Sequence, residues 1–245
     1  MSLTLEGFVT YAESLDPSFP SRIIGANQSE IRDLASLVPI AIPEVYLRFL
    51  QLMGKSDGGM RFFRNAATNI DAIVEAYSGH QDDYFESVLR GDDRHMLIIA
   101  YGSEVSDGIC SGFLNTNNME IFIGYDDLPE IFHAQSLIHL CYRTAFFRKV
   151  TAAFSSSMVC TPKKLKDPFA WVYVRDALIT MGFFEEEFSD TCYRVLRRED
   201  AAVSLSQIDM VGTWGHFGIL ILGGSQNTVF QIYSELGWQG LLMLV

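Results

Sequence analysis

The sequence has little of what marks membrane-spanning and secreted proteins. Its 245 residues are 49% hydrophobic, but the longest apolar stretch, residues 217–224, is far shorter than the ~20 residues of a membrane-spanning helix. The first residues, MSLTLEGF, have neither a charged start nor a long apolar segment, so we expect no secretory signal peptide. Together these absences predict a cytoplasmic protein.

Cysteine is scarce, and no two cysteines stand close together in the sequence. Cys110, Cys141, Cys160 and Cys192 are 31, 19 and 32 positions apart, whereas disulfide frameworks and zinc sites use closely spaced pairs. We therefore expect free, buried thiols in a reducing compartment and no disulfide.

Motifs for catalysis and cofactor binding are also missing. There is no Gly-x-Ser-x-Gly, His-Glu-x-x-His or Walker pattern. The glycines of 212–224 precede a predicted strand instead of opening a helix, which favours a turn or bulge over a phosphate loop. His133 and His139 are six positions apart and would point from different sides of a helix, and the acidic turn 91–95 is better explained by solvation than by a divalent ion. We expect no catalytic residue, no cofactor and no metal.

Positive charge is limited, and the acidic excess is concentrated in one segment. The net charge of −12 disfavours binding to nucleic acid or to an anionic membrane through the bulk surface. Residues 81–130 carry eleven acids and two bases, whereas residues 131–166 carry six bases and no acid. Two interpretations stay open: one strongly acidic face, or solvated loop residues scattered over the surface. The acids taken as candidate partner contacts are Asp82, Asp83, Glu86, Asp92, Asp93, Glu104, Asp107, Asp126 and Asp127.

Apolar periodicity predicts helices followed by strands in the first 154 residues. Tyr46, Phe49, Leu50 and Met53, for example, recur at the spacing of one helical face. Asn27 or Ser29 and then Thr68 or Asn69 are candidate helix caps. The expected helices are 3–15, 28–38, 43–54, 68–78 and 136–153, and the expected strands are 95–101, 109–115 and 120–125.

The composition changes at 155–167, a polar, basic and proline-bearing segment that we interpret as a linker. Beyond it, residues 168–245 predict an α-β-β-β-α lobe, which is either a separate unit or an extension of the first sheet. Asp167-Pro168 opens its first helix, and Val229, Phe230 and Tyr233 are expected to point inward from its last. The strands are expected at 192–198, 202–206 and 216–222, and the last helix at 226–236.

Residues 25–59 carry a resemblance to a known family. A leading glycine, a helix, the segment IPEVYLRFL at 42–50 and the pair Gly58-Gly59 occur in the order of the SUKH superfamily, an immunity-protein group that also contains Smi/Knr-type cell-wall regulators. The stretches 95–104, 109–118, 120–132 and 136–147 look like its later strands and closing helix. The matching residues are Pro43, Tyr46, Phe49, Leu50, Gly58 and Gly59, which are residues that determine a fold and perform no chemistry.

The resemblance implies an α+β protein whose first domain, 1–154, has a central, mainly antiparallel sheet flanked by helices. It also implies a non-enzymatic, cytoplasmic immunity protein that binds and neutralises a cognate toxin domain, such as a nuclease. An acidic face would mimic phosphate and speed association with such a partner. Two alternatives stay open: a Smi/Knr-type regulatory scaffold, and an enzyme or small-ligand receptor with a site between the two lobes.

Phe62 and Phe63, which stand between Arg61 and Arg64, have two interpretations. Adjacent aromatic residues most often lie in a core. Exposed on the segment after Gly58-Gly59, they would instead anchor a protein interface, where aromatic residues are enriched. We carry both residues as candidate partner contacts beside the core interpretation.

Overall fold

The computed structural model describes residues 3–63, 65–79, 95–105, 108–125, 128–162, 170–210, 213–238 and 242–243. The chain divides into an N-terminal unit, residues 2–144, and a C-terminal unit, residues 145–245. Both units combine helices with antiparallel strands, so the expected α+β class is confirmed. No helix among the described residues is long and apolar enough to cross a membrane.

The helices of the N-terminal unit lie close to the predicted positions. They are α1 (Leu5–Leu15), α2 (Gln28–Leu37), α3 (Glu44–Met53) and α4 (Ile70–Gly79). The Asn27 side chain accepts hydrogen bonds from the first turn of α2, and Glu30 bonds back to the Asn27 amide, which makes a capping box. Asn69 caps α4 by accepting a hydrogen bond from the Ala72 amide at 2.9 Å. These polar side chains fix where the helices begin.

A tight turn follows α3 and requires glycine. β1 (Ile23–Ile24) pairs with β2 (Ser56–Asp57), and the chain then turns through Gly58 and Gly59 at φ values of 67° and 83°. This left-handed region favours glycine. A Cβ atom on Gly58 would also lie 2.7 Å from the Phe19 ring. Sterics and backbone conformation therefore demand glycine here.

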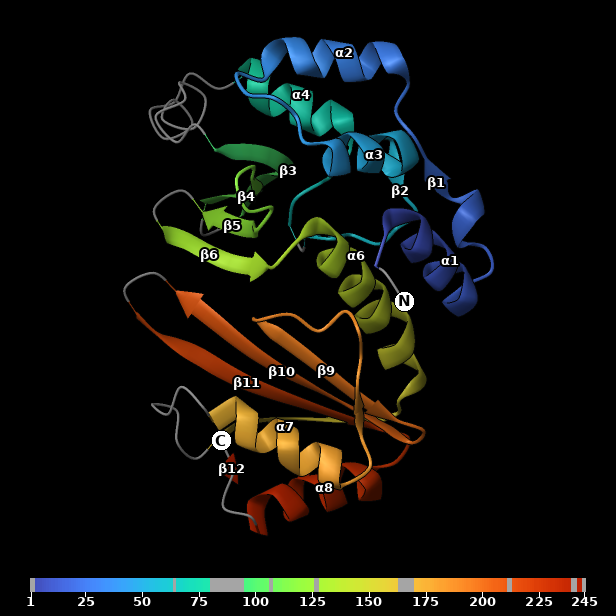
Figure 1. Ribbon diagram of the computed structural model, residues 1–245, viewed down its shortest axis with the longest axis vertical. Coiled ribbons are helices and arrows are strands. Elements are labelled where there is room, and N and C mark those ends of the chain that lie inside the picture. Colours follow the sequence, from blue (N-terminus) through green and yellow to red (C-terminus); the bar gives the residue numbers. More distant parts are fainter. Residues whose placement is uncertain are drawn as a thin grey trace. The chain divides into compact units, whose positions relative to one another are not determined.

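The sheet of the N-terminal unit is an antiparallel meander. It is formed by β3 (Met96–Val105), β4 (Gly108–Asn115), β5 (Ile121–Tyr125) and β6 (Leu128–Ala134). α4 packs between α2 and β3 (Figure 1), and the Tyr77 hydroxyl accepts a hydrogen bond from the Ile98 amide. Helix and sheet are thus joined by a polar contact as well as by apolar packing.

Phe62 and Phe63 lie in the core of this unit, which corrects their prediction as partner contacts. Their exposed fractions are 4% and 2%. The Phe62 ring lies 5.6 Å from Phe49 and 6.1 Å from Phe8, centroid to centroid. Burial of two aromatic side chains stabilises the fold strongly, so the sequence pattern that suggested an interface reflects packing.

α6 (Leu137–Ala145) begins at the Ser136 cap, as expected. The helical path continues as a π-helical turn, Phe146–Val150, and a 3₁₀ turn, Thr151–Ala153. The predicted helix 136–153 is therefore correct in extent but changes its hydrogen-bonding pattern after Ala145.

The four cysteines are free and buried, as expected from their spacing.

The C-terminal unit is an antiparallel sheet with helices on one face (Figure 1). Its strands lie in the order β12, β7, β11, β10, β9 and β8. Buried apolar side chains between the sheet and the two helices, among them Val174, Leu178, Ile219 and Ile232, form its core. The elements are β7 (Ser156–Pro162), α7 (Ala170–Thr180), β8 (Phe184–Glu185), β9 (Tyr193–Arg198), β10 (Ala201–Met210), β11 (Thr213–Gly223), α8 (Gln226–Trp238) and β12 (Leu242–Met243).

β7 corrects the linker prediction of 155–167 for residues 156–162, which form a strand; residues 163–167 lie outside the described residues. Cys160 of β7 is buried opposite Ile219, and Met158 packs on the core opposite Ile221. Val159, between them, is 69% exposed. A polar strand is stable here because only alternate side chains need to be apolar. The composition of the segment suggests a linker because it does not show that core-facing residues alternate with exposed ones along the strand.

The inward face of α8 differs by one residue from the expected one. Val229 and Ile232 are buried, and Tyr233 packs partly against the core, but Phe230 is 60% exposed. Phe230 points outward because a residue next to Val229 lies about 100° away around the helix. The helix also continues through Gly237, which was predicted to end it, to Trp238.

Candidate functional site

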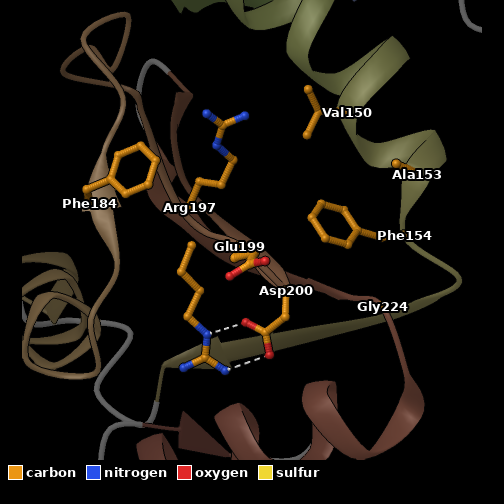
Figure 2. Close-up of a pocket in the computed structure, with 9 residues that line it drawn as sticks. Val150, Ala153, Phe154, Phe184, Arg197, Glu199, Asp200 and Gly224 are labelled. Atoms are coloured by element: carbon orange, nitrogen blue, oxygen red, sulfur yellow. Dashed lines mark hydrogen bonds and ion pairs between the residues drawn. The ribbon is translucent and has the colours of Figure 1, made fainter.

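A groove of about 550 Å³ lies in the C-terminal unit beside the β9–β10 hairpin (Figure 2). It combines apolar side chains with a run of four charged residues. We take it as the candidate site because cavities with a few converging polar groups are where ligands most often bind. Its lining residues are Val150, Ala153, Phe154, Phe184, Arg197, Arg198, Glu199, Asp200 and Gly224.

The backbone around the groove is held by hydrogen bonds. Phe184 of β8 pairs with Arg197 of β9, and Glu199 and Asp200 form the turn between β9 and β10. The Gly224 amide donates to the Asp200 carbonyl at 3.0 Å, and the Ser155 hydroxyl donates to the Gly224 carbonyl at 2.8 Å. The hairpin and the segments beside β7 and β11 are therefore fixed to one another.

Arg198 is committed to the structure of the hairpin. Its Nε lies 2.6 Å from Asp200 Oδ1, and a second nitrogen lies 3.3 Å from Oδ2 (Figure 2). The guanidinium also donates to the Met181 carbonyl and lies 4.8 Å from the Phe183 ring centroid. Carboxylate, carbonyl and aromatic ring together leave Arg198 little freedom to recognise a ligand.

Arg197 has different partners on the same strand. Its Nε lies 3.0 Å from Glu186 Oε1, and its guanidinium carbon lies 5.4 Å from the Phe184 ring centroid. Burial raises the pKa of Glu186, the Arg197 charge opposes that rise, and Glu187 adds to it. In Figure 2 the Arg197 side chain extends between Phe184 and Val150. Arg197 thus contributes both an apolar stem and a paired charge to the groove.

Glu199 is the charged group of the groove that has no ion-pair partner among the described residues. Its carboxylate lies at the turn between β9 and β10, beside Asp200 in the sequence, and its side chain is exposed. The lining holds two bases, Arg197 and Arg198, and two acids, Glu199 and Asp200. Both arginines are paired with carboxylates, so the exposed Glu199 carboxylate is the charge in the groove that is open to a ligand.

A separate ion network stands on the other side of β9. Glu185 accepts hydrogen bonds from Arg175 at 2.6 Å and from Arg194 at 2.8 Å, and Arg194 lies 4.8 Å from the Trp171 ring centroid. Burial tends to raise the pKa of Glu185, but the bonds from the two arginines outweigh it and lower the pKa. This network joins α7 to β8 and β9 and so fixes the strand that carries the groove.

The groove combines charged and aromatic side chains. Its carboxylates are those of Glu199 and Asp200, and no histidine, cysteine or serine is among its lining residues. Burial raises the pKa of the Cys160 thiol to about 11 and that of Cys141 well above its ordinary value. Within the described ranges, no three His, Cys, Asp or Glu side chains are grouped as metal ligands.

A second hollow, of about 420 Å³, lies in the N-terminal unit between α1, α3 and α6. Its charged residues are Glu6, Glu44 and Arg48, and its apolar ones include Leu5 and Ile138. Arg48 Nε lies 2.6 Å from Glu6 Oε1, and this hydrogen bond lowers the pKa of Glu6. Both partners are largely exposed, so the pair contributes little to stability.

Of the residues predicted from the sequence as partner contacts, the described ones, Phe62, Phe63 and Glu104, are not among the lining residues of either hollow. Glu104 is on β3, where only its backbone is described. The groove was not predicted from the sequence. Residues 197–200 are four consecutive charged residues between two apolar strand patterns, which indicates a charged hairpin. The other acids, Asp82, Asp83, Glu86, Asp92, Asp93, Asp107, Asp126 and Asp127, lie outside the described residues.

No family model matches this chain, and neither a curated protein nor a solved structure matches it.

Proposed function

We propose that this protein is a cytoplasmic immunity protein. It binds a cognate toxin domain through a protein–protein interface and neutralises it without catalysing a reaction.

The observation that carries the proposal is the packing of residues 25–59. A Cβ atom on Gly25 would overlap the Gln51 carbonyl oxygen on α3, so the leading glycine is needed for close approach. Tyr46, Phe49, Leu50 and Met53 of α3 are buried, and Gly58-Gly59 has the positive φ values that only glycine adopts easily. Residues that carry the SUKH resemblance thus help to determine the fold, as the resemblance implies, and this supports the resemblance.

The charge balance supports a basic partner. A toxin that cleaves nucleic acid needs a positively charged cleft, and a protein of net charge −12 is attracted to such a surface over long range. Electrostatic attraction of this kind speeds association well beyond the ~10⁵ to 10⁶ M⁻¹s⁻¹ of neutral partners. The groove supports a binding role because it combines charged side chains with the half-exposed Phe184 ring.

Co-expression with the toxin encoded beside this gene tests the proposal. We expect the wild-type chain to restore growth of cells that produce the toxin and to elute with it as one complex in size-exclusion chromatography. Growth arrest despite equal soluble yields of both proteins, together with separate elution, would refute it.

A regulatory scaffold of the Smi/Knr type is the second candidate, and the C-terminal unit favours it. Residues 155–245 have no counterpart in the minimal SUKH domain, and they supply a groove of their own. An added binding surface suits a protein that joins endogenous partners. Capture of the same endogenous protein in cells that lack a toxin gene would support this candidate over the first.

A further inference from the structure

The charged residues of the groove differ in whether they already have an ion-pair partner. Arg197 and Arg198 already hold carboxylates at 3.0 and 2.6 Å. Glu199, in contrast, is exposed and has no cation within ion-pair distance among the described residues. A ligand that meets Glu199 gains a new ion pair without breaking an existing one.

The groove also exposes apolar surface that a ligand could cover. Phe184 is 50% exposed, although Arg197 lies over part of its ring. Phe154 and Val150 are half-buried on the facing wall (Figure 2). Burial of such surface contributes about 25 cal/mol per Å². A suitable ligand therefore carries an aliphatic portion as well as a charge.

An anion fits this arrangement poorly. To reach Arg198 it would displace Asp200, and to reach Arg197 it would displace Glu186, losing about as much electrostatic energy as it gains. It would also be repelled by Glu199. A cation is attracted by the exposed Glu199 carboxylate, whereas the two arginines of the groove are already paired with carboxylates, so charge complementarity selects a cationic ligand at Glu199.

We infer that this groove binds an arginine side chain of the partner protein. This inference rests on the proposed function, because the partner supplies the arginine. The guanidinium pairs with Glu199, and the aliphatic stem lies between Phe154 and Phe184. Arginine suits the site better than lysine because its planar guanidinium binds a carboxylate through two hydrogen bonds and stacks on aromatic rings.

The first test uses the isolated protein and N-acetyl-arginine-N-methylamide as the probe, followed by NMR amide shifts. We expect saturable shifts at millimolar probe that are centred on Glu199, Asp200 and Phe184. The uncharged norleucine analogue should cause much smaller shifts. Absent shifts, or equal shifts with the norleucine analogue, would overturn the inference.

Substitutions sharpen the test. Glu199→Gln should weaken probe binding about fivefold, as expected for loss of a solvent-exposed ion pair. Glu235→Gln removes an exposed acid from α8, away from the groove lining, and is the matched control. It should leave affinity unchanged. Equal affinity of wild type and Glu199→Gln would show that Glu199 is not the partner of the guanidinium.

The complete toxin separates the two proposals. If the toxin binds wild type, Glu199→Gln and Phe184→Ala equally well, the groove inference fails and the immunity function stands. If the probe binds at the groove but no toxin forms a complex, the immunity function fails and the groove remains a site for a cationic side chain. Circular dichroism of each variant verifies that it is folded.

Discussion

The two units differ in the aromatic contacts that predominate. In the N-terminal unit, phenylalanines pack against one another in the core, as Phe8 does with Phe19 and Phe62, although Arg22 also lies over Phe19. In the C-terminal unit, Arg194 lies over Trp171 and Arg197 over Phe184, beside the ring–ring contact of Phe146 with Phe188. Ring–ring packing favours burial, whereas an arginine over a ring can stabilise it at the surface. Among the described residues, arginine–ring pairs are therefore concentrated around β9.

Replacing a ring in each unit tests this contrast most strongly. Phe63→Ala removes a side chain that is 2% exposed and should lower the free energy of unfolding by about 3–5 kcal/mol. Phe184→Ala removes a ring that is 50% exposed and should cost less than about 1.5 kcal/mol. Urea denaturation followed by circular dichroism measures both. Equal losses would show that the two rings are not used differently.

The ion network beside β9 should have an intermediate effect. Glu185→Gln leaves Arg175 and Arg194 without their shared carboxylate, and we expect a loss of about 1–3 kcal/mol. Lys55→Met is the matched change in the N-terminal unit, because Lys55 joins Glu30 and Asp71 near the surface. It should cost clearly less stability than Glu185→Gln, because ion pairs of exposed groups contribute little. A larger loss of stability for Lys55→Met than for Glu185→Gln would show that the ion pairs of Lys55 stabilise the fold more than the network around Glu185 does.

The sequence predicted local structure well where one side of an element was strongly apolar. The helices around Tyr46 and Val174 were found because their buried residues recur at helical spacing. β7 was not predicted because the composition of 155–167 as a whole suggested a linker, although Met158 and Cys160 of β7 alternate with exposed residues. Composition describes what a segment contains, but burial depends on which positions share a face.

The groove was harder to predict for a different reason. Its residues come from the helical turns that follow α6, from β8, from the β9–β10 hairpin and from Gly224 just after β11, which are distant in sequence. Only the run 197–200 was visible as a local signal. Which of Glu199 and Asp200 stays unpaired depends on the direction of the Arg198 side chain, which pairs with Asp200. The sequence pattern does not give that direction. Sites assembled across a sheet need the topology first.

The smallest predicted effect on stability concerns His133 of the N-terminal unit, whose ring stays uncharged. His133 lies 5.7 Å from the Phe63 ring centroid, and its backbone carbonyl accepts a hydrogen bond from the buried Arg143. Burial, and then the Arg143 charge, lower the pKa of His133 well below its ordinary value. His133 therefore packs on Phe63 as a neutral ring, in contrast to the arginines over rings around β9.

This depressed pKa makes stability depend on pH in a defined direction. Below pH ~6.5 the unfolded chain binds a proton at His133 and the folded chain does not, so stability falls as the pH drops toward the folded-state pKa. The maximum slope from this residue is about 1.4 kcal/mol per pH unit. His133→Gln does not titrate and can still accept a hydrogen bond from Arg143. We expect urea denaturation between pH 7 and 5 to show a smaller loss of stability for the variant. Equal slopes in the two proteins would mean that His133 becomes charged in the folded state as readily as in the unfolded chain.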